Sequence, residues 1–271
     1  MLGELLNKAH IGDNVDFMKK LPDDCINLTV TSPPYDDLRR YNGYSFDFEK
    51  VANELFRITK PGGVVVWVVG DKTRNGSESL TSFKQAFYFN SIGFNLHDTM
   101  IYEKVNPLPQ NHKRYEQSFE YMFVFVKGKL STFNAITEPC KKVGHKYDYS
   151  KRKSSSTKES GGAGRKRNEI LVTKPTKQKS NIWRYSVGQH KTTSDTYAFK
   201  HPAMFPEQLA HDHIVSWSNP GDIIFDCFAG AGTTLKMAKK NGRDFIGVEL
   251  SAEYVDITNQ RLMELETEAI Q

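Results

Sequence analysis

The segment from Asp222 to Thr234 limits the possible folds more than any other part of the chain. Ile223 to Asp226 has the apolar character of a buried strand, and it leads into a glycine-rich turn, Phe228 to Gly232, after which Thr233 to Lys240 has the pattern of a helix. Glycine lets a backbone approach a ligand closely, and the first turn of a helix offers unpaired amide donors. This order is typical of a doubly wound α/β sheet that binds a nucleotide-like cofactor.

A second apolar strand, Phe245 to Val248, ends at Glu249. In doubly wound folds an acidic residue about 20 residues beyond the glycines accepts hydrogen bonds from ribose hydroxyls. A glycine-rich turn alone can also be a simple tight connection. The spacing to Glu249 favours a cofactor site.

The remaining chain alternates helical and strand patterns. Helices are predicted over 14–20, 48–59, 79–91, 201–217 and 252–265, and strands over 26–31, 64–69, 96–103 and 121–127, with the last two as an antiparallel edge. No apolar run approaches the roughly 20 residues of a membrane helix, and the N-terminus does not resemble a signal peptide. We therefore expect a cytoplasmic protein with one catalytic core. His211 and His213 lie two positions apart on a predicted helix, so no metal site is expected.

Positive charge is concentrated in one region. Residues 141–180 contain 13 Lys and Arg against 3 Asp and Glu, whereas the rest of the chain has a net charge of −5. Clusters of Gly and Ser in the same region predict an insertion with a mobile loop. Such a region favours a polyanion through phosphate contacts, although a solvated linker has a similar composition.

The strand over 26–31 runs into Ser32-Pro33-Pro34-Tyr35, a motif suited to planar amino groups. An exocyclic amino nitrogen is a poor nucleophile because its lone pair is delocalised into the ring. Hydrogen bonds from its two hydrogens to the Ser32 hydroxyl and the Pro33 carbonyl would draw the nitrogen towards tetrahedral geometry. The two prolines stiffen the turn, and Tyr35 offers a ring on which a flipped base can stack. The alternative is a plain Pro-Pro turn after a strand.

Together these motifs resemble the β-class amino-methyltransferases of DNA, in which the catalytic motif precedes the cofactor motifs. Six segments in the family's order cover nearly the whole chain. They are Thr31–Tyr35, Lys60–Gly63, Asn106–Arg114 with Glu120, Phe199–Pro206, Phe228–Thr234 and Gly247–Glu249, and Ile11–Asp13 resembles a further segment near the cofactor adenine. The chain departs from many relatives at Cys227, where they have Pro, and at Ala231, where they have Ser. Both changes are small.

The resemblance implies an α/β fold with a doubly wound, mostly parallel, seven-stranded Rossmann-like methyltransferase sheet and a circularly permuted motif order. It implies a catalytic half over 1–127, a basic target-recognition insertion over 128–198 and a cofactor-binding half over 199–271. The implied cofactor is S-adenosylmethionine, and the implied substrate is double-stranded DNA whose target base is flipped out. A cognate restriction endonuclease is a candidate partner, and the sequence leaves monomer and homodimer open.

The resemblance also assigns residues to the site. The catalytic residues are Ser32, Pro33, Pro34 and Tyr35. The residues expected to bind the cofactor are Asp13, Lys200, His201, Pro202, Asp226, Phe228, Ala229, Gly230, Ala231, Gly232, Thr233, Thr234 and Glu249. The residues expected to bind DNA are Lys151, Arg152, Lys153, Arg165, Lys166 and Arg167.

The target base depends on one residue. Family members with Ser at the first motif position mostly resemble cytosine-N4 enzymes and those with Asp adenine-N6 enzymes, so Ser32 favours cytosine N4 over adenine N6. Cys140 after Pro139 superficially resembles the nucleophile of cytosine-C5 enzymes, but it follows the wrong strand. RNA or protein methyltransferases with related motifs are an alternative, but in those families the glycine-rich loop usually precedes the catalytic motif, which is the opposite of the order in this chain. A catalytically silent DNA-binding protein would not need the intact Ser32 and Glu249.

Overall fold

The computed structural model describes residues 2–34, 47–107, 109, 113–148, 170–188 and 191–268. The chain divides into two compact units, one comprising 1–134 and 181–271 and the other 135–180. The predicted insertion, 128–198, contains the smaller unit, 135–180. The other residues of the predicted insertion, 128–134 and 181–198, belong to the larger unit.

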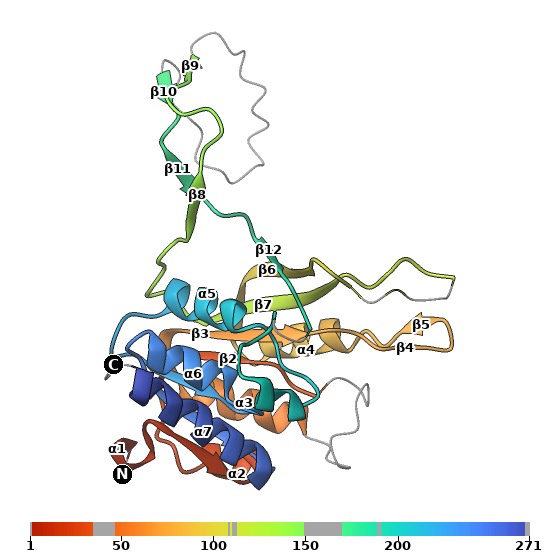
Figure 1. The fold of residues 1–271 in the computed structure, drawn as a ribbon, viewed down its shortest axis with the longest axis vertical. Helices are drawn as coiled ribbons and strands as arrows, with labels where there is room; N and C mark the ends of the chain where they lie inside the picture. The colour runs from red at the N-terminus through yellow and green to blue at the C-terminus, as the bar shows by residue number, and fades with distance from the viewer. Residues whose placement is uncertain are drawn as a thin grey trace. The chain divides into compact units, whose positions relative to one another are not determined.

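Eight strands form the central sheet of the larger unit, in the order β1-β14-β13-β2-β3-β7-β6-β12 (Figure 1). Their bounds are β1 Lys8–Ile11, β2 Ile26–Thr31, β3 Thr59–Val69, β6 Phe94–Lys104, β7 Phe119–Lys127, β12 Ile182–Tyr185, β13 Ile223–Asp226 and β14 Asp244–Glu249. Neighbours pair in parallel, except that β7 runs antiparallel to β3 and β6. The predicted α/β fold with a mostly parallel sheet is confirmed, with eight strands instead of seven.

Two strands extend the sheet beyond the apolar runs seen in the sequence. In β12 the side chains of Trp183 and Tyr185 are buried while Ile182 and Arg184 are exposed, so this strand has only one buried face. The other is β1, which no pattern predicted because it is short and none of its residues is fully buried. It pairs in parallel with β14 and places Ile11 opposite Glu249.

The helices form two groups against the sheet. Their bounds are α1 Leu2–Leu5, α2 Asn14–Met18, α3 Phe48–Ile58, α4 Thr81–Ser91, α5 Glu207–Trp217, α6 Thr233–Lys240 and α7 Ala252–Glu268, with a 3-10 turn, η1, over Thr196–Lys200. Helices α2, α3 and α4 pack in succession, as do α5, α6 and α7. The helix predicted over 201–217 begins only at Glu207, because Pro202 and Pro206 disfavour helical backbone in the residues before them.

Short antiparallel pairs complete the structure. In the smaller unit β8 (Thr137–Pro139) pairs with β11 (Thr176–Gln178), and β9 (Lys146–Asp148) pairs with β10 (Ile170–Val172). In the larger unit β4 (Thr73–Arg74) and β5 (Ser77–Glu78) form a hairpin. None of the helices in the described part of the chain is long and apolar enough to span a membrane.

A buried hydrogen bond links α4 to the middle of the sheet. Trp67 in β3 is fully buried and lies edge-on to Phe48 and Phe89, with ring centroids 5.9 and 5.1 Å away. Its indole N–H donates to Gln85 Oε1 at 2.8 Å. Gln85 is itself buried, so both polar groups depend on each other.

Replacing Gln85 by Leu should therefore lower the free energy of unfolding by about 1–3 kcal/mol, because the indole N–H loses its partner in an apolar core. Chemical denaturation would measure the change. Lys84→Leu on the exposed side of the same helix is the control and should stay within about 0.5 kcal/mol of the parent. Equal stabilities for both variants would contradict the proposed role of this hydrogen bond.

Candidate active site

The start of the predicted catalytic motif and the glycine-rich turn lie at the same edge of the sheet. Strands β2 and β13 are parallel neighbours, and the chain leaves them in opposite directions, to β3 on one side and β14 on the other. This is the topological switch point where doubly wound sheets bind ligands. The hydroxyl of Thr31, at the end of β2, donates to Asp226 Oδ1, at the end of β13, at 2.6 Å. Ser32 therefore starts its motif next to the cofactor turn.

A cavity of about 1890 Å³ lies at this edge. Ser32 and Pro34 line it together with four consecutive residues of the turn, Phe228 to Ala231. Pockets for single small ligands usually measure about 300–1,000 Å³. This cavity has room for a nucleoside-like cofactor and a second ligand of similar size.

Asp226 is a buried carboxylate between the two motifs. Its side chain is 2% exposed and accepts from the Thr31 hydroxyl and from the Phe228 amide at 3.0 Å. Burial raises the pKa of Asp226 to about 6, and these hydrogen bonds offset only part of the effect. A buried carboxyl with a strongly raised pKa next to a cavity is typical of functional sites.

The glycines of the turn are required by its geometry. Gly230 and Gly232 have φ angles of +51° and +75°. A Cβ atom on Gly230 would lie 2.8 Å from Nε2 of His201, and one on Gly232 would lie 2.4 Å from Cγ2 of Thr258. The His201 ring in turn lies edge-on to Tyr254, with centroids 4.5 Å apart. The turn is thus packed directly against the segment that follows η1.

Two carboxylates lie at the ends of β14 and β1. Glu249 accepts from the amides of Gly230 and Ser251, both at 2.9 Å, so its carboxylate is fixed beside the turn. Asp13 follows β1 and caps α2 by accepting from the Asp16 amide at 3.0 Å. Both residues line the cavity. The β1–β14 pairing, which the sequence did not reveal, brings them together.

A separate part of the cavity wall comes from β6, β7 and the segments beside them. Lys104 forms an ion pair with Glu120 at 2.6 Å. Asn106 exchanges two hydrogen bonds with the backbone of Val187, at 2.8 and 2.9 Å. Phe119 also lines this wall and lies edge-on to Tyr121. Asn106 and Glu120 belong to the family segment expected near the target base, and Lys104 and Phe119 lie beside it on the same wall.

Most of the predicted cofactor residues in fact line the cavity. Those that do are Asp13, His201, Pro202, Asp226, Phe228, Ala229, Gly230, Ala231, Thr233 and Glu249. Lys200, Gly232 and Thr234 do not: Lys200 ends η1, Gly232 caps α6, and Thr234 is buried and donates to the Val30 carbonyl at 3.1 Å.

The predicted catalytic and DNA-binding residues are only partly described. Pro33 is buried and does not line the cavity that Ser32 and Pro34 line, while Tyr35 lies outside the described residues. All six basic residues predicted to bind DNA also lie outside them: Lys151, Arg152, Lys153, Arg165, Lys166 and Arg167. The prediction of site residues missed Tyr254 and Phe119, which line the cavity. Their positions depend on packing between distant segments, so no local motif marks them.

Comparisons with known proteins agree with this geometry. Residues 26–260 match the DNA methylase family of N6 and N4 methyltransferases. The orphan methyltransferase M.BamHII of Bacillus amyloliquefaciens is 54% identical over 246 residues, which is 90% of this chain and 92% of that protein. The type II methyltransferase M1.MboII of Moraxella bovis is 30% identical over 272 residues, 96% of this chain and 98% of that protein.

Solved structures share the fold. PvuII DNA methyltransferase (cytosine-N4-specific) superposes with a TM-score of 0.68 at 20% identity, over 93% of this chain and 85% of that one. TTHA0409, a putative DNA modification methylase from Thermus thermophilus complexed with S-adenosyl-L-methionine, gives 0.62 at 24% identity, over 95% and 93%. The match over 26–260 and the 54% identity show that the chain belongs to the DNA methylase family of N6 and N4 methyltransferases and is an S-adenosylmethionine-dependent DNA methyltransferase.

Proposed function

We propose that this methyltransferase modifies N4 of a flipped cytosine in double-stranded DNA, with Ser32-Pro33-Pro34-Tyr35 as its catalytic motif. The observation that carries the proposal is that Ser32 and the glycine-rich turn line one cavity, held together by the hydrogen bond from Thr31 to Asp226. An amino-group motif and a cofactor turn at one switch point provide the two halves of a methyl-transfer site.

The residues around the turn fit S-adenosylmethionine by their chemistry. Glu249 and Asp13 are acceptors suited to ribose hydroxyls and an adenine amino group, and both line the cavity. Asp226, buried and negatively charged above pH 6, suits the α-ammonium group at the amino acid end of the cofactor. When bound there, the cofactor supplies an electrophilic methyl group on its sulfonium sulfur.

The chain's own residues prepare the nucleophile. The Ser32 hydroxyl and the Pro33 carbonyl would accept hydrogen bonds from the two N–H groups of the amino nitrogen. These hydrogen bonds would direct the lone pair of the nitrogen at the methyl carbon. Tyr35 would stack on the flipped base and hold its ring in place. No covalent bond between enzyme and base is needed, so neither Cys140 nor the buried Cys227 has a part in this chemistry.

Cytosine N4 is favoured over adenine N6 by Ser32, because Asp is typical of the first motif position in adenine enzymes of the family. The test is to incubate the protein with tritiated S-adenosylmethionine and unmethylated DNA of mixed sequence, digest the DNA and separate the nucleosides. We expect label in N4-methyldeoxycytidine. Label in N6-methyldeoxyadenosine would overturn the choice of base, and absence of label would overturn the catalytic motif.

Contact with DNA is proposed for the smaller unit. Its described residues include six lysines, Lys141, Lys142, Lys146, Lys174, Lys177 and Lys179, against Glu138 and Asp148. A two-stranded antiparallel ribbon of this kind can enter a major groove, and the lysines suit phosphate contacts. Together with the basic residues on either side of residue 160, this unit would hold the duplex during methylation.

The proposed location of this activity is the cytoplasm.

Replacing Ser32 by Ala should lower kcat about 10²–10³-fold, because one acceptor for the amino hydrogens is lost in the transition state. The Kd for S-adenosylmethionine should stay the same, since Ser32 belongs to the half of the site assigned to the base. Single-turnover methylation and calorimetric binding measure the two quantities. Ser91→Ala, at the exposed end of α4, is the control. A variant that keeps full kcat would contradict the role of Ser32.

Replacing Asp226 by Asn should stabilise the free protein yet weaken cofactor binding. Because the folded pKa is about 6 against an ordinary 3.8, the folded protein holds the extra proton between these values and stability falls as pH rises through this window. Asn keeps an acceptor for Thr31 and Phe228 without the buried charge. The variant should gain up to about 3 kcal/mol at pH 8 and nothing near pH 4.

Denaturation of both proteins from pH 4 to pH 8, with cofactor binding measured at pH 8, checks the Asp226 prediction. Parallel stability curves for parent and variant would show that Asp226 does not titrate in this window. Unchanged affinity for S-adenosylmethionine would remove Asp226 from the cofactor site.

Replacing Lys151, Arg152 and Lys153 by Gln should weaken DNA binding and reduce the magnitude of the slope of log K against log salt by about 2–3. The reason is that binding releases about one counterion fewer from the DNA for each phosphate contact that is lost. The same substitutions at Lys19, Lys20 and Lys50, exposed on and beside α2 and α3, are the matched control and should leave the slope unchanged. Fluorescence anisotropy at several salt concentrations gives both slopes. Equal slopes for the two triple variants would assign 151–153 to a passive linker.

A further inference from the structure

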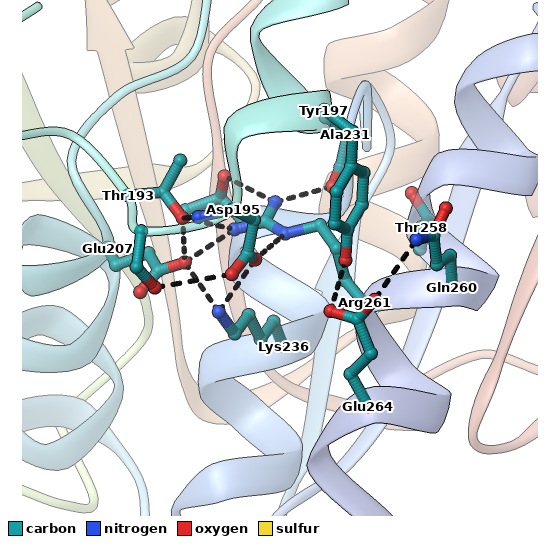
Figure 2. A network of polar contacts seen from close by, with 12 residues as sticks. Thr193, Asp195, Tyr197, Glu207, Ala231, Lys236, Thr258, Gln260, Arg261 and Glu264 are labelled. Carbon is teal, nitrogen blue, oxygen red and sulfur yellow. Dashed lines mark hydrogen bonds and ion pairs between the residues drawn. The ribbon is translucent and has the colours of Figure 1, made fainter. Parts of the chain in front are cut away.

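Arg261 of α7 is fully buried and does not line the cavity, yet its guanidinium contacts both segments that form the cofactor wall (Figure 2). It donates to Asp195 Oδ2 at 2.6 Å, Glu207 Oε1 at 2.5 Å, the Ala231 carbonyl at 2.5 Å, Thr233 Oγ1 at 3.2 Å and Thr193 Oγ1 at 3.4 Å. A guanidinium has five N–H donors in a fixed plane. The five acceptors match that number.

The acceptors belong to two chain segments. Ala231 and Thr233 are part of the glycine-rich turn and the start of α6. Asp195 and Glu207 stand on either side of η1 and residues 201–206, which include the cavity residues His201 to Phe205. Arg261 therefore binds both segments from outside the cavity. It contacts the glycine-rich turn through the Ala231 carbonyl, and the segment that contains His201 through the carboxylates of Asp195 and Glu207.

The glycine-rich turn and the segment that contains His201 are in tight contact. The position of a Cβ on Gly230 is only 2.8 Å from His201 Nε2, and His201 is confined on another side by Tyr254. Interiors packed this closely transmit small displacements. A shift of either segment relative to the other would change the shape of the cavity where the turn and His201 line it.

The formal charges in the cluster around Arg261 balance. Lys236 donates to Asp195 Oδ2 at 2.7 Å and to Glu207 Oε1 at 2.9 Å, so two cations face two carboxylates. Burial acts to raise the pKa of Asp195, but the hydrogen bonds from Lys236 and Arg261 outweigh it and hold the pKa below its ordinary value. Thr193 adds a hydroxyl donor to Glu207 at 2.6 Å.

Stability alone is a weak reason for such a cluster, because well-packed apolar residues of similar volume often stabilise a fold as well or better. A hydrogen-bonded cluster of ion pairs instead fixes the relative orientation of the segments that it joins. We propose that Arg261 is a positioning residue for cofactor binding, which sets the separation between the glycine-rich turn and the His201 segment from outside the cavity. This inference rests on the proposed function, since it requires the cofactor to bind between these walls.

The test compares Arg261→Lys with Arg57→Lys. Lysine keeps the charge but replaces a planar fork of five donors by three donors on a flexible stem. Arg57 is a matched control, because it also binds two carboxylates, Asp23 and Glu54, and two backbone carbonyls, those of Leu21 and Met18. None of these partners belongs to the glycine-rich turn or to residues 193–207, and none lines the cavity. The probe is S-adenosylhomocysteine, with its Kd measured by calorimetry and Tm measured on the same samples.

For Arg261→Lys we expect the Kd for S-adenosylhomocysteine to rise about tenfold, and hydrogen exchange of residues 196–205 and 228–234 to accelerate in the free protein. Arg57→Lys should lower Tm without changing the Kd. Asp195→Asn, which keeps the shape of the side chain, gives a second reading if Arg261→Lys does not fold, and it should also raise the Kd.

A Kd that stays within about twofold of the parent in a folded Arg261→Lys or Asp195→Asn variant, with a loss of Tm like that of Arg57→Lys, would show a purely structural role and overturn the inference. A parent protein that binds no S-adenosylhomocysteine would instead overturn the proposed cofactor site, and this inference with it.

Discussion

The hydrogen bond from the Thr31 hydroxyl to the Asp226 carboxylate, at 2.6 Å, joins two residues 195 positions apart in the chain. It connects the carboxyl ends of β2 and β13, where the sheet reverses its direction of winding. Ser32 follows one of these residues and the glycine-rich turn follows the other. The distance between Ser32 and the glycine-rich turn therefore depends on a contact between two strand ends, which neither segment could establish alone.

Asp226 and Arg261 are both buried, but their partners differ. Among the described residues no cation donates a hydrogen bond to Asp226, so burial raises its pKa to about 6 and its charge destabilises the free protein at neutral pH. A bound cationic group would relieve that cost. In the cluster around Arg261 two cations, Arg261 and Lys236, form ion pairs with two carboxylates, Asp195 and Glu207. The unpaired charge of Asp226 supports its proposed role in cofactor binding, and the balanced cluster supports the proposed positioning role of Arg261.

Much of the fold follows from local pattern, because β3 and β13 are buried on both faces and read as continuous apolar runs. β1 has no such run and is defined by its pairing with β14, so the sequence did not reveal that the segments of Asp13 and Glu249 lie side by side. Apolar spacing predicts a helix from residue 201, whereas α5 begins at Glu207, because Pro206 disfavours helical backbone in the residue before it. Tyr254 lines the cavity, and Arg261 contacts segments that line it, through packing between residues far apart in the chain. Such contacts leave no local signature.

A crystal structure of the protein with S-adenosylhomocysteine would test whether β2 and β13 carry the two halves of one methyl-transfer site. The ligand is expected to lie along Phe228 to Ala231, with its ribose hydroxyls on Glu249 and its sulfur directed towards Ser32. A ligand bound elsewhere in the cavity, or one in this place whose sulfur is directed away from Ser32, would contradict the claim.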